Sequence, residues 1–297
     1  IVLSEGEIKF SPDKTEYEVR VKGSEIKISA KPSNKHAKVE GTGSVYVNTV
    51  SKAVIKVTAE DGDTVMKYAL TFIRDCDAKG FKSWAILSPN SLAYLMSPSA
   101  DAVSGKWKQF HQGGYFPADG QPVLVPFINM DSRDFLSKIP KDANKVVIIA
   151  EPFSAIGKDA SGIEKDINLY RSLIEDIKRH AGSARVYITG AIPPAKSFPR
   201  TLRYYWSELV WSFGEIKHLR YTAPYMRPDR FNAFNAALKG LAEELGASFI
   251  SLDGSGLIDS KGYLKEEYAS WYGTGEGSQL NQNGIVLLGD AIVKAAE

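Results

Sequence analysis

The sequence predicts a doubly wound α/β domain with a parallel sheet and helices on both faces, preceded by a small all-β sandwich. Two observations predict this fold class. Up to about residue 75, apolar and polar residues alternate, as in strands with one buried face. From residue 83 to 297, apolar runs of strand length alternate with amphipathic runs of helix length, as in parallel sheets with helical crossovers. We therefore expect a sandwich over 1–75, a linker over 76–82 and an α/β domain over 83–297.

Period-two patterning marks the strands of the sandwich, which we expect to pair antiparallel. The expected strands are 17–21, 26–28, 45–47, 54–57 and 68–73. Asp61-Gly62 supplies a turn before the last of them. Glu60, Asp61 and Asp63 could hold calcium at this turn or simply form a solvated turn. The linker is short and polar, so the two domains should touch.

The α/β domain alternates strands and helices in a regular order. We expect strands at 83–88, 122–126, 145–150, 185–189 and 248–252, and helices at 163–180, 230–245 and 282–296. Prolines at both ends of 122–126 favour an edge strand. A ligand crevice should lie outside the carboxyl ends of the strands, at 87–91, 127–131, 150–154, 190–194 and the loop before the last helix.

Composition excludes several classes of protein. The net charge of +2 over 297 residues gives no drive toward nucleic acid. No apolar run reaches membrane-spanning length, and Ile1 opens a folded-looking segment, so we expect neither a membrane span nor a signal peptide. Cys76 is the single cysteine, and the four histidines lack metal-ligand spacing, so no metal or other cofactor is indicated.

Ser91 is the first candidate for chemistry. The apolar strand 83–88 runs into Pro89, Asn90 and Ser91, and then into the apolar side of a helix. A hydroxyl at the first helical residue lies near free N–H groups and the positive end of the helix dipole. That place suits a nucleophile, and it equally suits an ordinary capping serine.

The α/β segment contains longer motifs that carry a resemblance. They are Phe234 to Leu252, Gly277 to Gly284, Val146 to Ile149, and Arg185 to Thr189 with Pro193-Pro194. With these motifs, residues 83–297 resemble the SGNH (GDSL) hydrolases, which implies a flavodoxin-like sheet and a serine esterase ancestry. Residues 10–13, 17–21 and 57–68 resemble the bacterial cadherin-like, immunoglobulin-like sandwich, which implies a secreted or cell-surface bacterial protein.

The catalytic blocks implied by the resemblance are altered. Ser91 stands where the family has the serine of Gly-Asp-Ser-Leu, with Asn90 before it, and Asn129 lies near the place of an oxyanion glycine. Ala150-Glu151-Pro152-Phe153 replaces Gly-x-Asn-Asp, and proline has no N–H to donate. Glu276 and Gln279 replace the aspartate and histidine of Asp-x-x-His.

These changes bear directly on proton transfer. A serine hydroxyl is a weak nucleophile until a positioned base takes its proton, and an amide such as that of Gln279 cannot do so. His111 or His218 could supply a base, or each could be an ordinary surface or packing histidine. Glu151 is either a base or ligand contact at the crevice, or a structural carboxylate.

Aromatic residues and arginines gather in the segment 195–228 and beyond. The candidates for ligand contact are Trp206, Trp211, Tyr225, Arg227 and Trp271. Such side chains suit sugar rings by stacking and bidentate hydrogen bonding, and they suit packing within or between domains equally.

Three functions follow. The first is a secreted or cell-surface protein, catalytically impaired, that binds a glycan or cell-surface polymer. The second is an active serine esterase that uses Ser91 on an acylated polysaccharide. The third is a structural or adhesion module. The sequence indicates no oligomeric state.

Overall fold

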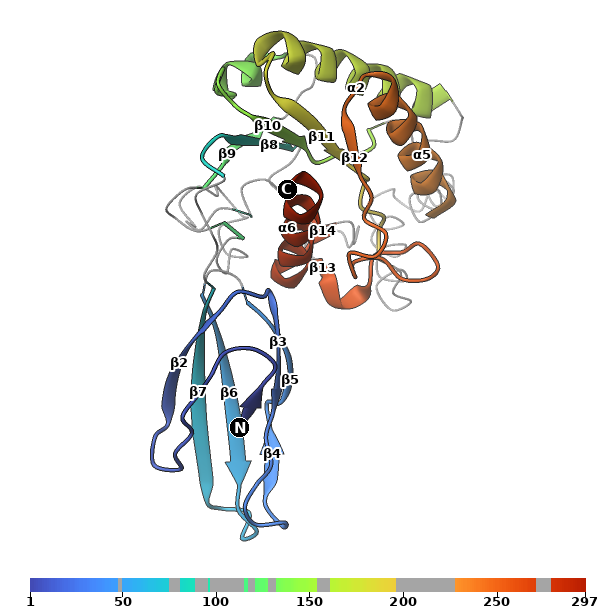
Figure 1. Ribbon diagram of the computed structural model, residues 1–297. Coiled ribbons are helices and arrows are strands. Elements are labelled where there is room, and N and C mark those ends of the chain that lie inside the picture. Colours follow the sequence, from blue (N-terminus) through green and yellow to red (C-terminus); the bar gives the residue numbers. More distant parts are fainter. Residues whose placement is uncertain are drawn as a thin grey trace, which may run out of the picture.

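A computed structural model describes residues 1–47, 50–74, 81–88, 96, 115–116, 121–127, 132–153, 161–195, 228–270 and 279–297. The early residues form a β-sandwich and the later ones an α/β unit (Figure 1).

The sandwich contains two sheets, with strand orders β1-β3-β5 and β2-β7-β6-β4. Its strands are β1 (Val2–Leu3), β2 (Glu16–Val21), β3 (Glu25–Ser29), β4 (Lys38–Glu40), β5 (Gly43–Tyr46), β6 (Val50–Thr58) and β7 (Val65–Arg74). In β2, the buried residues Tyr17, Val19 and Val21 alternate with exposed ones, so the period-two pattern fills the space between the sheets. The predicted all-β sandwich is confirmed.

One pairing in the sandwich is parallel, where we expected antiparallel strands throughout. β2 runs parallel to β7, while β6 and β7 pair antiparallel, as do β3 and β5. The alternation of apolar and polar residues shows which face of a strand is buried. It does not depend on whether the neighbouring strand runs parallel or antiparallel. The strand β4 was missed because Val39 is its only apolar residue.

The α/β unit is built on five parallel strands in the order β12-β11-β10-β8-β9. These strands are β8 (Trp84–Ser88), β9 (Val123–Pro126), β10 (Lys145–Ile148), β11 (Arg185–Thr189) and β12 (Ser248–Ile250). The chain starts in β8, adds β9 on one side and then builds outward on the other side. This is the flavodoxin-like order. β9 lies at the edge of the sheet, as its prolines predicted.

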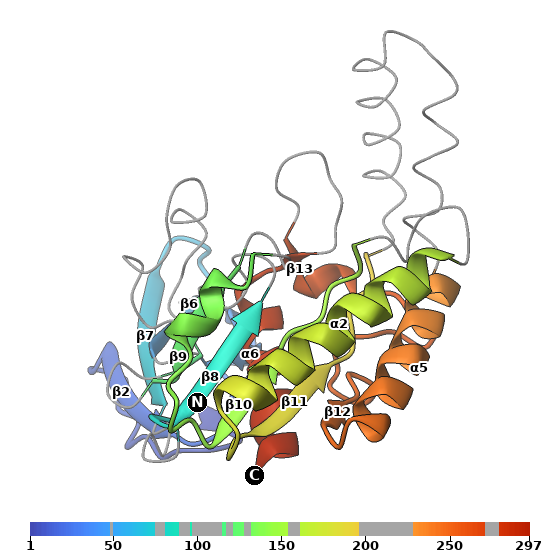
Figure 2. The same ribbon diagram turned by 90° about the horizontal axis from the view of Figure 1, so that it is seen from above.

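Helices cover both faces of this sheet (Figures 1 and 2). The remaining elements are α2 (Ser161–His180), α5 (Pro228–Glu244), α6 (Gln282–Ala296), two 3-10 helices at Asp134–Lys138 and Glu266–Tyr268, and the antiparallel pair β13 (Ala269–Ser270) and β14 (Gln279–Leu280). Ala85 and Leu87 of β8 pack in the core under α2 and α5, and Trp84 and Ile86 pack in the core under α6. The three predicted helices are confirmed to within two residues at each end.

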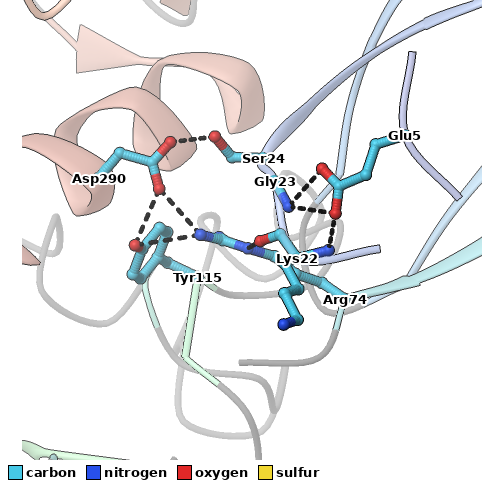
Figure 3. A network of polar contacts seen from close by, with 7 residues as sticks. All are labelled: Glu5, Lys22, Gly23, Ser24, Arg74, Tyr115 and Asp290. Carbon is cyan, nitrogen blue, oxygen red and sulfur yellow. Dashed lines mark hydrogen bonds and ion pairs between the residues drawn. The ribbon is translucent and has the colours of Figure 1, made fainter. Parts of the chain in front are cut away.

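The sandwich touches the α/β unit through α6 (Figure 3). The Asp290 carboxylate accepts hydrogen bonds from Arg74 Nη2 at 2.9 Å and from the Tyr115 hydroxyl at 2.9 Å, and also from the Ser24 hydroxyl. The Arg74 guanidinium lies 4.6 Å from the centre of the Tyr115 ring. Burial raises the pKa of Tyr115, so its hydroxyl stays protonated and donates to Asp290.

A second contact joins the two parts beside this network. The hydroxyls of Tyr46 on β5 and Tyr268 lie 2.6 Å apart. Phe81, inside the predicted linker, packs against Trp84 in the core of the α/β unit. The division of the chain at 76–82 stays a prediction, and residues 75–80 lie outside the described residues.

Gly289 on α6 should resist replacement by alanine. A Cβ atom there would overlap the ring of Tyr115, which Asp290 and Arg74 hold in place. We expect Gly289→Ala to lower the free energy of unfolding by about 1–3 kcal/mol in urea titrations, although alanine favours a helix by about 1 kcal/mol. Gly240→Ala on α5 is the control, because a Cβ there meets nothing within 4 Å and should stabilise. Equal stabilisation by both changes would contradict this packing.

Candidate functional site: the carboxyl edge of the α/β sheet

The strand order changes direction at β8, because β9, the next strand in the chain, lies on one side of β8 and β10 lies on the other. In open α/β sheets, ligands bind outside the carboxyl ends of the strands at such a switch point. β8 ends at Ser88, which is fully buried, and β10 continues into residues 149–153.

Most of the predicted site residues lie outside the described residues. These are Asn90, Ser91, Asn129, Trp206, Trp211, Tyr225, Arg227, Trp271 and Glu276. Their roles stay predictions. Gln279 is the first residue of β14 and pairs with Ser270. β14 lies directly before α6 in the chain, and the Asn281 side chain caps α6 by accepting a hydrogen bond from Gly284 N. The backbone of Gln279 therefore stands before the last helix, in the loop that the sequence assigned to the crevice.

Glu151 follows β10, and its backbone is held by one tyrosine of α2. Its N–H donates to the Tyr170 hydroxyl at 2.8 Å, and that hydroxyl donates to the Glu151 carbonyl at 2.8 Å. Tyr170 is fully buried, and burial raises its pKa well above the usual range. The phenol therefore stays neutral, which lets one oxygen accept and donate at the same time.

Two further buried side chains hold the neighbouring backbone. Asp166 of α2 accepts from Phe153 N at 2.8 Å, and Thr189 of β11 accepts from Ala150 N at 3.1 Å. Both side chains belong to fully buried residues. Burying a carboxylate is costly unless hydrogen bonds compensate, so these groups specify one backbone path at this point.

The result is a fixed ledge of residues 150–153, here called the β10 ledge. It presents the half-buried Glu151 beside Phe153, whose exposed fraction is 46%. The centre of the Phe153 ring lies 6.3 Å from the centre of the Tyr170 ring. A carboxylate accepts hydrogen bonds from hydroxyls, and an exposed ring offers an apolar face for stacking.

Sequence reasoning selected Glu151 but missed Phe153 and the side chains beneath it. The sequence of the predicted helix 163–180 did indicate the side chains that hold the ledge. Asp166 lies four residues before Tyr170, on the same face as Leu173 and Ile174, and a carboxylate within an apolar stripe calls for a buried partner.

The two described histidines lie away from this edge. His180 ends α2, as predicted, and its Nε2 lies 2.9 Å from the Ile139 carbonyl, before the start of β10. That position is the amino edge of the sheet. His36 belongs to the sandwich, and His111 and His218 lie outside the described residues.

Asp61 forms the turn predicted before β7. Its carboxylate accepts from the Thr64 hydroxyl at 2.6 Å, from Thr64 N at 2.9 Å and from Asp63 N at 3.0 Å. These bonds, with that of the Thr64 side chain the strongest, lower the pKa of Asp61. Within the described residues, no group of three or more acidic, histidine or cysteine side chains is placed to hold a metal ion.

None of the helices in the described residues combines the length and apolarity needed to cross a membrane.

Comparison with known proteins gives matches in structure only. No family model matches the chain, and no curated protein matches it. A GDSL-like lipase from Bacteroides thetaiotaomicron is 15% identical, covering 72% of this chain and 87% of its own, with a TM-score of 0.45. An extracellular lipase from Streptomyces rimosus is 13% identical, covering 71% and 98%, with a TM-score of 0.42.

A third solved structure also matches. It is the periplasmic domain of a lipopolysaccharide acetyltransferase from Salmonella ser. Paratyphi A, which is 14% identical, covering 73% of this chain and 84% of its own, with a TM-score of 0.38.

Proposed function

We propose that this chain binds a glycan or cell-surface polymer at the carboxyl edge of its α/β sheet, as a secreted or cell-surface bacterial protein, without cleaving it. The observation that carries the proposal is the β10 ledge. Three buried polar side chains from two elements fix the backbone of a short loop that presents Glu151 and an exposed Phe153. Sites that bind weakly hydrated sugar faces need this kind of preorganisation, because ordering a loop on binding costs affinity.

The residue at the position of the catalytic histidine supports binding over hydrolysis. By the resemblance to SGNH hydrolases, Gln279 stands at the position of the catalytic histidine. An amide cannot accept the proton of a serine hydroxyl. Losing a triad member lowers turnover by several orders of magnitude. The cadherin-like sandwich would then serve as a spacer or packing module.

A binding test and a turnover test together decide the proposal. We expect a purified chain to bind members of a glycan array, and Phe153→Ala to weaken that binding by about tenfold in calorimetry, the equivalent of about 1.4 kcal/mol. Phe10→Ala, at an exposed phenylalanine of the sandwich, is the matched control and should leave affinity unchanged.

Turnover of p-nitrophenyl acetate should not exceed that of Ser91→Ala. Hydrolysis that disappears in Ser91→Ala would replace this proposal with the active esterase, in which His111 or His218 supplies the base. Absence of binding to every glycan would favour the structural or adhesion module.

A further inference from the structure

A cleft opens at the same edge of the sheet, at the ends of the next two strands beyond the β10 ledge. One face of α5, the ends of β11 and β12 and residues 258–262 line it, and its volume is about 750 Å³. Small-molecule sites typically span roughly 300–1,000 Å³. This space, here called the α5 cleft, is therefore large enough for a ligand and has no part in the proposed catalytic blocks.

The inner wall of the α5 cleft is fixed by hydrogen bonds. The Asn235 amide accepts from Ala191 N at 2.8 Å and donates to the Ala191 carbonyl at 3.3 Å, which ties α5 to the end of β11. Gly190 permits this approach, because a Cβ there would lie 3.3 Å from Asn235 Nδ2. The wall therefore needs little reorganisation when a ligand enters.

The rim of the cleft carries both signs of charge in equal number. Its lining residues include two lysines, Lys239 and Lys261, and two aspartates, Asp253 and Asp259. Asp259 Oδ1 accepts from Lys261 N and Tyr263 N, and Asp253 accepts from the Ser251 hydroxyl at 3.0 Å. Within the described part of the chain, neither lysine forms an ion pair.

This lining selects a class of ligand. Two ammonium groups and two carboxylates balance one another, so the lining gives a ligand of either net charge no overall electrostatic attraction. A hydroxyl group can donate to a carboxylate and accept from an ammonium or from the exposed amide of Asn232. Neutral polyhydroxylated molecules satisfy all of these groups.

The α5 cleft and the β10 ledge follow one another along the carboxyl edge of the sheet. β10, β11 and β12 are consecutive neighbours, and strands lie about 4.8 Å apart, so one to two strand spacings, roughly 5–10 Å, separate the ledge from the strand ends that line the cleft. We infer that the α5 cleft is a second subsite for a neutral polysaccharide that runs along the carboxyl edge from the β10 ledge. This inference rests on the proposed function, because it takes the ledge as the first subsite.

The test compares short and long neutral oligosaccharides. Gluco-, xylo-, manno- and N-acetylgluco-oligosaccharides, each as dimer and hexamer, would be titrated calorimetrically into the purified chain. For the series that binds, we expect the hexamer to bind at least about tenfold tighter than the dimer, because two linked subsites act at high effective concentration. The double variant Asn232→Ala, Lys239→Ala should abolish this gain and leave dimer affinity unchanged.

Controls separate the two proposals. Both substituted positions are exposed, so the fold should persist, as circular dichroism would verify, and Lys165→Ala on an exposed position of α2 should change nothing. A hexamer that gains nothing over the dimer, or a gain that survives the double variant, overturns the second subsite. In that case the proposed function stands if Phe153→Ala still weakens binding. Failure of every oligosaccharide to bind overturns both.

Discussion

Replacing Asp290 with alanine is expected to uncouple the sandwich from the α/β unit and to cost about 3 kcal/mol of unfolding free energy. The change would leave the Arg74 side chain, only 9% exposed, without the Asp290 carboxylate, and would remove the acceptor of the Tyr115 and Ser24 hydroxyls. We take the low end of the range for buried pairs because the Asp290 side chain is 33% exposed. Urea unfolding followed by circular dichroism and tryptophan fluorescence should show one transition for the parent chain and two for the variant.

A compensating double variant tests whether the lost unfolding free energy comes from a buried charge that has no counter-charge. Arg74→Met with Asp290→Leu removes both charges, and well-packed apolar residues can replace a buried ion pair at little cost. We expect this double variant to recover most of the lost stability and the single transition. If Asp290→Ala unfolds with the parent's midpoint and in one step, the junction does not couple the two parts.

Removing the Tyr170 hydroxyl is expected to cost about 2–3 kcal/mol. Tyr170→Phe keeps the ring in the core but leaves two backbone groups of Glu151 without their partner, and an unsatisfied buried polar group costs about 1–3 kcal/mol. Thermal and urea unfolding would measure the loss. Hydrogen exchange of the Glu151 amide should accelerate by more than the loss of global unfolding free energy predicts, because the variant lacks the hydrogen bond that this amide donates to Tyr170.

Tyr187→Phe is the matched control for this variant. Tyr187 is also a buried tyrosine of the α/β unit, and its hydroxyl makes no hydrogen bond to a described residue. Its replacement should change stability by less than about 0.5 kcal/mol. Equal costs for the two replacements would show that the Glu151 bonds contribute nothing specific.

The sequence predicted elements well where burial alone determines them. The last helix was predicted at 282–296 and is observed there, because its apolar period is clear and Asn281 provides the N-cap. The α/β class followed from alternation of strands and helices. The sequence could not predict which strands pair or in which direction, because the parallel pairing of β2 with β7 leaves the pattern of buried residues unchanged.

The site was less accessible to sequence reasoning than the fold. Glu151 was predicted as a candidate because it follows an apolar strand, and its role stays a prediction, whereas Phe153 looked like an ordinary apolar residue. The position proposed for Phe153 depends on Asp166, 13 residues away, which accepts a hydrogen bond from the Phe153 backbone. Contacts such as Arg74 with Asp290, 216 residues apart, likewise require the folded chain.

The contact between Arg74 and α6 also has a consequence for a pull that is applied to the sandwich. A pull on the sandwich passes along β7 to Arg74 and from there to the last helix, in parallel with the covalent peptide that follows residue 74. Tension is therefore shared by side chains and main chain. If the sandwich is attached to a surface, the ion pair between Arg74 and Asp290 would restrict rotation of the α/β sheet relative to that surface.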